Sequence, residues 1–272
     1  MAHPQGLRRI VAAASCRHFI MNPTAFGILV LVCTFGGALS GIWLRGVLPE
    51  QHLSSESSAT VKVGIGLIAT MTALVLGLVT ASARSSFDGM STAVRDTASD
   101  ILALDRTLAR YGPESADARE ALYHVVEVRL DTLWPESSSR APELDVPDVR
   151  RAETLVAQIQ ELAPQNDDQQ RLRSRALNLG EALLEARWVV SSAAGTSILV
   201  PFLAVLLFWL SITFTSFGLF APRNSTVIGT LFVCAVSVGS AVFLILEMDG
   251  PFDGLIRVSP DALRHALAQM NQ

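Results

Sequence analysis

The stretch VGIGLIATMTALVLGLVTASAR, residues 63–84, runs for 21 residues before its first charged residue, Arg84. A helix needs about 20 apolar residues to cross a hydrocarbon core of roughly 30 Å. Three other stretches meet this requirement: Ala25–Leu44, Thr196–Phe220 and Thr226–Met248. Backbone groups in lipid must be satisfied within a helix or a closed barrel. The sequence therefore predicts an all-α, polytopic membrane protein with four transmembrane helices, the second at Val63–Ala83.

The composition agrees with a membrane protein and argues against several other classes. Of the 272 residues, 50% are hydrophobic and 17% are charged, whereas an average soluble domain has about 25% charged residues. The formal net charge is -4, and nucleic-acid binding would require a basic stripe, so we expect no nucleic-acid partner. The three cysteines, Cys16, Cys33 and Cys234, form neither a disulfide framework nor a zinc-binding spacing.

Basic residues near the four stretches are distributed unequally and predict the orientation in the membrane. One side collects eight arginines: Arg8, Arg9, Arg17, Arg84, Arg95, Arg187, Arg257 and Arg264. The other side has Arg45, Lys62 and Arg223. Because basic loops stay in the cytoplasm, we expect both termini to be cytoplasmic and residues 45–62 and 221–225 to face outward.

Residues 84–191 predict a cytoplasmic helical bundle inserted between the second and third transmembrane helices. The segment carries 19 acidic residues and 13 arginines, a net charge of -6. Its first helix shows apolar residues at helical spacing and no proline, so it continues the second span as one rod from about Val63 to Tyr111. The predicted divisions of the chain are 1–83, 84–191, 192–248 and a C-terminal amphipathic segment, 249–272.

Glycine, proline and capping residues predict the ends of the helices in the bundle. Gly112-Pro113 ends the rod and starts a second helix, which stops at Pro135 before a polar loop, residues 135–147. Asp148 can cap a third helix that Pro164 ends, and a fourth helix starts near Asn166-Asp167 and feeds into the third span. Pro201 is expected to kink the third span or to lie in its first turn.

Small and hydroxylated residues recur along one face of the second span and end at an arginine: Gly66, Thr70, Ala73, Gly77, Thr80 and Arg84. The other side of the helix carries bulky residues such as Leu67, Leu74 and Leu78. Small residues leave room for a narrow pore, and threonine hydroxyls would wet its wall. Small residues at this spacing equally allow close packing of helices in lipid. Both interpretations are open, and they place this face against water or protein.

Other patterns suggest packing or interfacial roles. Gly37-x-x-x-Gly41 in the first span predicts close helix packing. An acidic cluster, Glu247, Asp249 and Asp253, marks the end of the fourth span, where an ionisable group is a functional candidate. We expect Phe252, Leu255 and Ile256 in the membrane interface. Ser259-Pro260 starts a short amphipathic helix that docks on the protein or on the bilayer.

The sequence contains little that points to catalysis. The five histidines are scattered and none has metal-ligand spacing, and no glycine-rich phosphate loop or nucleophile elbow is present. We therefore expect no catalytic residues, no metal and no cofactor.

Four segments resemble the bacterial bestrophin-like family of membrane proteins. They are residues 74–88 (LVLGLVTASARSSFD), residues 104–114 (LDRTLARYGPE), residues 217–224 (FGLFAPRN) and residues 244–263 (LILEMDGPFDGLIRVSPDAL). The resemblance that these segments carry extends over roughly residues 24–268. The resemblance implies two spans, a cytoplasmic helical insert and two further spans in the inner membrane. Bestrophins are pentameric ion channels whose second helix lines the pore, although bulky apolar rings line their neck and the face here is small.

These observations favour a homo-oligomeric ion channel whose second span lines the pore, with inorganic ions of undetermined sign as partners. An arginine ring at Arg84 would favour anions, whereas the acidic insert would attract cations. The alternative is a non-conducting membrane scaffold or regulatory protein whose cytoplasmic bundle binds a partner through residues 135–147 and the terminal helix. A membrane enzyme or a secondary transporter is a third possibility.

Overall fold

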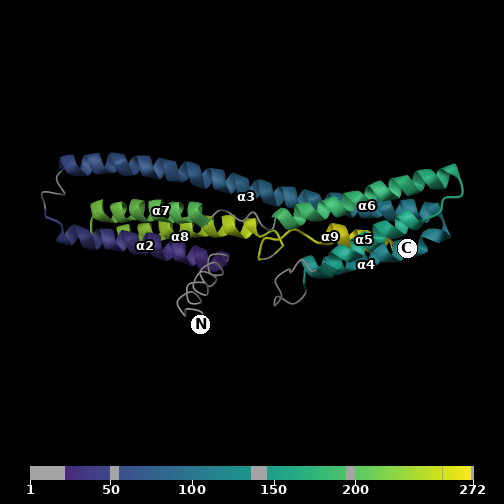
Figure 1. The fold of residues 1–272 in the computed structure, drawn as a ribbon. Coiled ribbons are helices and arrows are strands. Elements are labelled where there is room, and N and C mark those ends of the chain that lie inside the picture. Colours follow the sequence, from purple (N-terminus) through teal and green to yellow (C-terminus); the bar gives the residue numbers. More distant parts are fainter. Residues whose placement is uncertain (1–21, 50–54, 136–145, 194–199, 253, 271–272) are drawn as a thin grey trace, which may run out of the picture. The chain divides into compact units, whose positions relative to one another are not determined.

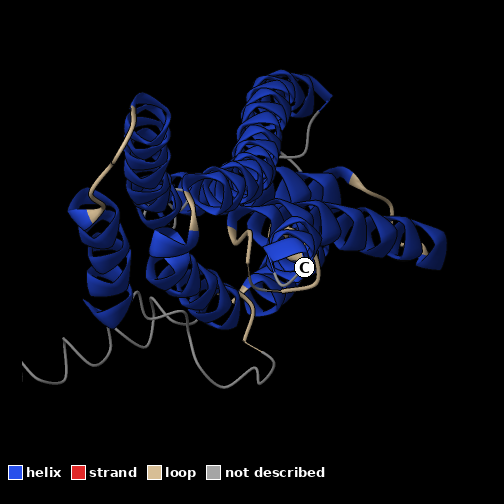
Figure 2. Cartoon of the chain, turned by 90° about the vertical axis from the view of Figure 1, so that its right-hand side faces the viewer, coloured by secondary structure: helices blue, strands red, loops and turns tan. Residues whose placement is uncertain are grey.

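The computed structural model describes residues 22–49, 55–135, 146–193, 200–252 and 254–270. Every regular element among these residues is a helix (Figure 2), as the sequence predicts. The elements are α2 (Pro23–Val47), α3 (Ser55–Tyr111), the 3-10 helix η2 (Pro113–Ser115), α4 (Ala116–Leu133), α5 (Val146–Glu161), α6 (Asp167–Ala193), α7 (Val200–Phe220), α8 (Ser225–Asp249) and α9 (Asp261–Met270).

The chain forms two compact units, each built from two separate stretches of sequence. The apolar unit comprises Met1–Ser85 and Ile198–Asp249, and the bundle unit comprises Ser86–Ser197 and Gly250–Gln272. The first boundary falls inside α3, so this helix contributes to both units.

Four helices are long and apolar enough to cross a membrane, which confirms the predicted spans. They are Pro23–Val47, the apolar part of Ala59–Tyr111, Phe202–Phe220 and Ser225–Asp249. α7 begins at Val200 among the described residues, so Pro201 lies in its first turn, where its missing N–H costs no hydrogen bond.

Close packing of α2 against α7 and α8 holds the apolar unit together (Figure 1). A Cβ atom added at Gly41 would collide with the carbonyl oxygen of Thr215, and one added at Gly218 would collide with that of Ala38. A Cβ at Gly37 would lie 2.9 Å from the hydroxyl of Thr215. The predicted packing role of Gly37-x-x-x-Gly41 is therefore confirmed.

α3 is one helix of 57 residues, which confirms that the second span and the first helix of the bundle are continuous. It begins at Ser55, so the predicted start near Val63 is wrong, and residues 55–62 of the predicted loop are helical. It ends at Tyr111 because Gly112 adopts a φ of 130°, a conformation that side chains with a Cβ disfavour. Pro113 then occupies the first position of η2, and α4 follows. The sequence rule of glycine after a helix and proline at the start of the next one holds here.

The bundle unit packs α3, α4, α5, α6 and α9 around an apolar core. Several of its side chains are less than 2% exposed, including Leu104, Leu108, Leu122, Ile159 and Leu263. α4 ends two residues before Pro135, and α6 begins at Asp167, where the Asn166 side chain accepts a hydrogen bond of 2.8 Å from the Gln169 N–H. These predicted boundaries are confirmed.

The predicted start of α5 is also wrong. α5 begins at Val146, so Asp148 lies inside the helix and does not cap it. Pro147 is compatible with the first turn of a helix because its φ is fixed near the helical value. Most of the predicted loop at 135–147 and the junction between α6 and α7 lie outside the described residues.

The segment after α8 packs into the bundle core. The Trp134 indole N–H donates a hydrogen bond of 2.8 Å to the Val258 carbonyl, and the Phe252 ring lies edge-on to Trp134 at 5.3 Å. Phe252 is buried in the core, so its expected place in the membrane interface is wrong. α9 buries Leu263 and Ala266 in the same core and contacts α4, so the terminal helix docks on the protein.

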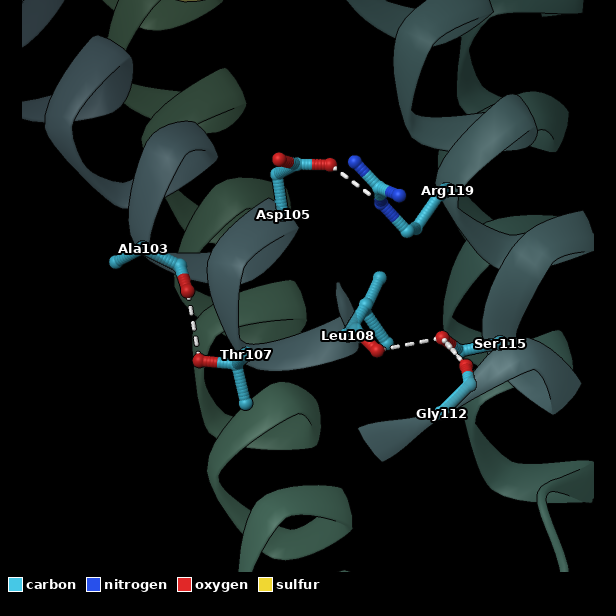
Figure 3. A network of polar contacts seen from close by, with 7 residues as sticks. All are labelled: Ala103, Asp105, Thr107, Leu108, Gly112, Ser115 and Arg119. Atoms are coloured by element: carbon cyan, nitrogen blue, oxygen red, sulfur yellow. Dashed lines mark hydrogen bonds and ion pairs between the residues drawn. The ribbon is translucent and has the colours of Figure 1, made fainter. Parts of the chain in front are cut away.

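A small polar network joins the end of α3 to the start of α4 (Figure 3). The Arg119 guanidinium contacts the buried Asp105 carboxylate at 2.8 Å. The Ser115 hydroxyl is fully buried and lies 2.6 Å from the Leu108 carbonyl and 2.8 Å from that of Gly112. Its single O–H can therefore donate to the Leu108 carbonyl, which lies in the last turn of α3, where carbonyl groups have no helical partner.

Two neighbouring hydroxyl groups are expected to differ in their effect on stability. The Tyr111 hydroxyl is buried with no hydrogen-bond partner among the described residues, whereas the Ser115 hydroxyl bonds to the end of α3. Ser115→Ala should destabilise the protein by about 1–3 kcal/mol, and Tyr111→Phe should leave its stability unchanged or raise it. Melting temperatures of the two variants in mild detergent test this. A larger loss in Tyr111→Phe would contradict it.

Candidate functional site

The six residues of the small-residue face all lie exposed on the part of α3 that belongs to the apolar unit: Gly66, Thr70, Ala73, Gly77, Thr80 and Arg84. Successive helix residues are about 100° apart, so the steps of three and four keep these residues on one side. The structure thus places them together on a continuous surface that the described part of the chain leaves uncovered.

Two other sides of the same helix segment have different surroundings. One side packs on the apolar unit, where Thr72 is buried and Val75 and Leu76 contact a cluster that includes Phe26 and Val30. The other side exposes bulky residues that include Leu67, Leu74 and Leu78. These three sides are roughly 120° apart around the helix axis.

Packing within the chain does not account for the glycines of the small-residue face. A Cβ atom added at Gly66 or at Gly77 would meet no other described atom within 4 Å. At Gly41 and Gly218 an added Cβ would collide with the backbone of the neighbouring helix. The small residues of this chain therefore fall into two groups. The glycines of α2 and α7 allow helices to pack within the chain, and the glycines of the small-residue face of α3 do not contact another helix of the chain.

The threonines of this face present oxygen atoms while remaining satisfied as donors. The Thr70 hydroxyl donates to the Leu67 carbonyl at 2.8 Å, and the Thr80 hydroxyl donates to the Leu76 carbonyl at 2.7 Å. Each hydroxyl oxygen keeps lone pairs that can accept a hydrogen bond from water or contact a cation. These hydroxyl donors therefore stay satisfied whether the surface borders water or an apolar environment.

The predicted acidic cluster is not a uniform exposed patch. Glu247 is only 4% exposed, Asp249 is half-buried, and Asp253 lies outside the described residues. Glu247 and Asp249 both take part in interactions. The sequence indicates the position of Glu247 at the end of a span, but the burial of its side chain depends on the tertiary structure.

Basic side chains at the opposite ends of the spans make contacts that sequence analysis missed. Arg45 donates to the Ala221 carbonyl just after α7, and Arg223 donates at 3.1 Å to the Ile42 carbonyl, five residues before the end of α2. Lys62 lies 5.2 Å from the ring centre of Phe220. The position of these basic residues near helix C-termini is a sequence signal for such contacts, because basic side chains there commonly bind the last carbonyls. In the sequence these residues indicated only the orientation in the membrane.

Among the described residues, no group of three histidine, cysteine, aspartate or glutamate side chains is placed to hold a metal ion. The surface with the most distinctive chemistry in the apolar unit is therefore the small-residue face of α3.

Comparison with known proteins gives two matches. The sequence model of the Bestrophin-like domain matches residues 32–263. Among solved structures, the chain is similar to a bacterial bestrophin homolog from Klebsiella pneumoniae that carries a point mutation, with a TM-score of 0.57 and 17% identity. The similarity covers 90% of this chain and 99% of that one. No curated protein matches. At this identity the structural likeness is evidence of a shared fold.

Glycine-to-alanine substitutions should distinguish the two groups of small residues. Both Gly218→Ala and Gly77→Ala gain about 1 kcal/mol of helix propensity, but only the Cβ at position 218 collides with a neighbouring helix. Overpacking costs about 1–3 kcal/mol or more. We expect Gly218→Ala to melt at a lower temperature than the unsubstituted protein, and Gly77→Ala to melt at the same or a higher temperature. A strongly destabilised Gly77→Ala would show that this face packs tightly against protein.

Proposed function

Because the chain belongs to the bestrophin-like family, we propose that this multi-pass membrane protein is a homo-oligomeric ion channel with α3 lining its pore. The small-residue face, from Gly66 to Arg84, would face a central axis shared by the subunits. The proposal places the protein in a bacterial inner membrane and assigns it no enzymatic activity.

The observation that carries this proposal is the exposure of the small-residue face in the single chain. In the most apolar window of α3, 6% of the residues are buried, compared with 28–33% in the other three spans. α3 is thus the span least covered by its own chain. Glycine leaves room on this uncovered face, and the threonine oxygens can accept hydrogen bonds from water, so the face suits a water-filled axis.

The proposed topology puts both termini and residues 84–191 in the cytoplasm, following the arginine distribution. Arg84 then lies at the cytoplasmic end of the pore-lining segment. A ring of arginines there would raise the local concentration of anions, whereas the net charge of -6 on residues 84–191 would attract cations. These opposing charges make Arg84 the informative residue for ion selectivity.

The alternative function, a non-conducting scaffold, has less support. It would use the terminal helix and residues 135–147 to bind a partner. The apolar residues of α9, including Leu263 and Ala266, are already buried in the bundle of the same chain. That helix therefore offers a partner only its polar side.

A bulky residue on the small-residue face should block conduction. Gly77 is exposed with open space around it, so Gly77→Leu should fold and assemble, and its side chain would project into the pore. We expect a ring of four or more subunits by native mass spectrometry in mild detergent, and a several-fold loss of ion flux in liposomes. The matched control is Gly64→Leu, which makes the same change on the opposite side of α3, also in open space, and should conduct normally.

Three results would overturn the channel proposal. A monomer or dimer in detergent would leave no axis to line. Unchanged flux in correctly assembled Gly77→Leu would show that this face is not the pore wall. The absence of flux in the unsubstituted ring, with liposome incorporation verified, would favour the scaffold.

The charge at Arg84 should set part of the ion preference, whichever ion the channel prefers. Arg84→Glu replaces a positive ring by a negative one, so the permeability ratio of cations to anions should rise. Reversal potentials in a salt gradient across a planar bilayer measure this ratio. The control is Arg264→Glu, which makes the same charge change at an exposed position on α9, outside residues 84–191. An unchanged ratio in Arg84→Glu would remove Arg84 from the conduction path.

A further inference from the structure

A groove opens on the surface of the apolar unit between α2 and α8. Its volume is about 270 Å³, and apolar atoms dominate its wall. Its lining includes Gly27, Ile28, Leu31, Gly239, Ser240 and Phe243. The groove exists because two glycines let the helices approach: a Cβ at Gly239 would lie 3.1 Å from the Gly27 carbonyl oxygen, and one at Gly27 would lie 3.0 Å from the Phe243 Cβ.

The same unit carries an exposed apolar ridge on α3. Leu74 and Leu78 are 75% and 70% exposed and lie one helical turn apart, so their side chains project side by side. Leu67 and Met71 are also exposed on this side, so the four side chains form a ridge. The groove is a depression with Gly27 and Gly239 in its lining. Small residues that receive bulky ones are the usual basis of close helix contacts in lipid, where exclusion of water contributes nothing.

In a ring of subunits, the ridge on α3 would point towards the neighbouring subunit. A helix that lines a central axis has three kinds of neighbour: the axis, the rest of its own subunit and the next subunit. Around α3, the small-residue face, the side with Thr72 and Val75, and the side with Leu74 and Leu78 are roughly 120° apart. If the first side faces the axis and the second contacts its own subunit, the ridge points sideways towards the next copy.

The groove lies on a different side of the unit from α3. On α2, Phe26 and Val30 belong to the cluster that α3 contacts, whereas Gly27 and Leu31 line the groove and lie about 100° further around the helix. On α8, Gly239 lies about 60° around the helix from Val242 of that cluster, and the lining of the groove contains residues of α2 and α8 and none of α3. Leu74 and Leu78 are exposed, so the ridge of one chain does not fill the groove of the same chain and is free to contact the groove of another.

The ridge and the groove also lie at similar levels along the membrane-spanning helices. α3 and α8 follow one transmembrane helix and three, respectively, so both cross the membrane in the same direction. Leu74 and Leu78 fall in the second half of the span Val63–Ala83, and Gly239 and Ser240 fall in the second half of α8. In two copies at the same height in a membrane, the two surfaces lie at similar levels.

We infer that Leu74 and Leu78 of one copy insert into the α2–α8 groove of the next copy, over Gly27 and Gly239. This inference rests on the proposed function, because it takes the small-residue face to look at a shared axis. The contact is head-to-tail: each copy offers its ridge to one neighbour and its groove to the other. Such heterologous contacts close into rings when the rotation between copies divides a full turn. Exposure of the ridge alone would not require a partner, since leucine is comfortable in lipid.

Disulfide cross-linking tests this contact directly. In a chain with Cys16, Cys33 and Cys234 replaced by serine, we would introduce Leu74→Cys and Ser240→Cys together. Both positions are exposed in the single chain, so the fold should tolerate them. After oxidation with copper phenanthroline in membranes, we expect a ladder of cross-linked species on a denaturing gel that reaches the full subunit number. Each single variant should give at most a weak dimer, because a head-to-tail contact does not bring identical positions together.

The native Cys234 provides the matched control. It is exposed on α8 but lies roughly 120° around the helix from Ser240. Leu74→Cys in a chain that keeps Cys234 as its second cysteine should give several-fold less of the ladder than Leu74→Cys with Ser240→Cys. Equal ladders from the two pairs would overturn the contact, since they would reflect random collisions in the membrane.

The outcomes separate this inference from the proposed function. A ring by native mass spectrometry without a ladder from Leu74→Cys with Ser240→Cys would overturn the ridge-and-groove contact and leave the channel proposal standing. In that case, rapid labelling of Ser240→Cys by a lipid-soluble maleimide in the intact ring would identify lipid as the occupant of the groove. A monomer in detergent and in membranes would overturn both.

Discussion

The unbroken backbone hydrogen bonding of α3 is the constraint on which the rest of the structure depends. No proline interrupts residues 55–111, so 57 residues form one helix about 86 Å long at 1.5 Å per residue. A continuous helix fixes the rotational phase of every side chain relative to every other. Within the apolar unit, Thr72 and Val75 lie on the side of α3 that packs on protein. Within the bundle unit, Met90 and Leu104 of the same helix are buried in the core.

Small residues have two physical roles in this chain, and only the structure separates them. At Gly41 and Gly218 the absence of a side chain lets α2 and α7 touch backbone to backbone, which replaces the hydrophobic driving force that is missing between helices in lipid. At Gly66 and Gly77 the space is empty. Because the hydroxyl donors of Thr70 and Thr80 are satisfied by their own helix, that empty surface can border water. The same residue types thus build the scaffold in α2 and α7 and a free surface in α3.

Much of the fold could be predicted from local sequence because local physics decides it. Spans follow from apolar length, and the helix boundaries at Gly112, Asn166 and Ser259 follow from backbone conformation and capping. Of the wrong predictions, one fails because a helix begins earlier than its expected capping residue and another because the contact joins residues far apart in the sequence. Asp148 loses its expected capping role because α5 begins earlier, around Pro147. Phe252 packs against Trp134, more than 100 residues away in sequence, and no local pattern predicts such a partner. The small-residue face was predicted as a set, but its role stayed open because pores and helix contacts both require small side chains.

Exposure has a different meaning on each side of α3. Leucine surrounded by lipid needs no explanation, since acyl chains are as apolar as its side chain. The small-residue face differs, because its glycines leave space and its threonine oxygens keep lone pairs that can accept hydrogen bonds from water. A single chain leaves both sides uncovered. In the proposed ring, rotational symmetry would gather the small-residue faces around an axis and would turn Leu74 and Leu78 towards the next subunit. The arrangement of residues around one helix therefore favours a ring over a chain that acts alone.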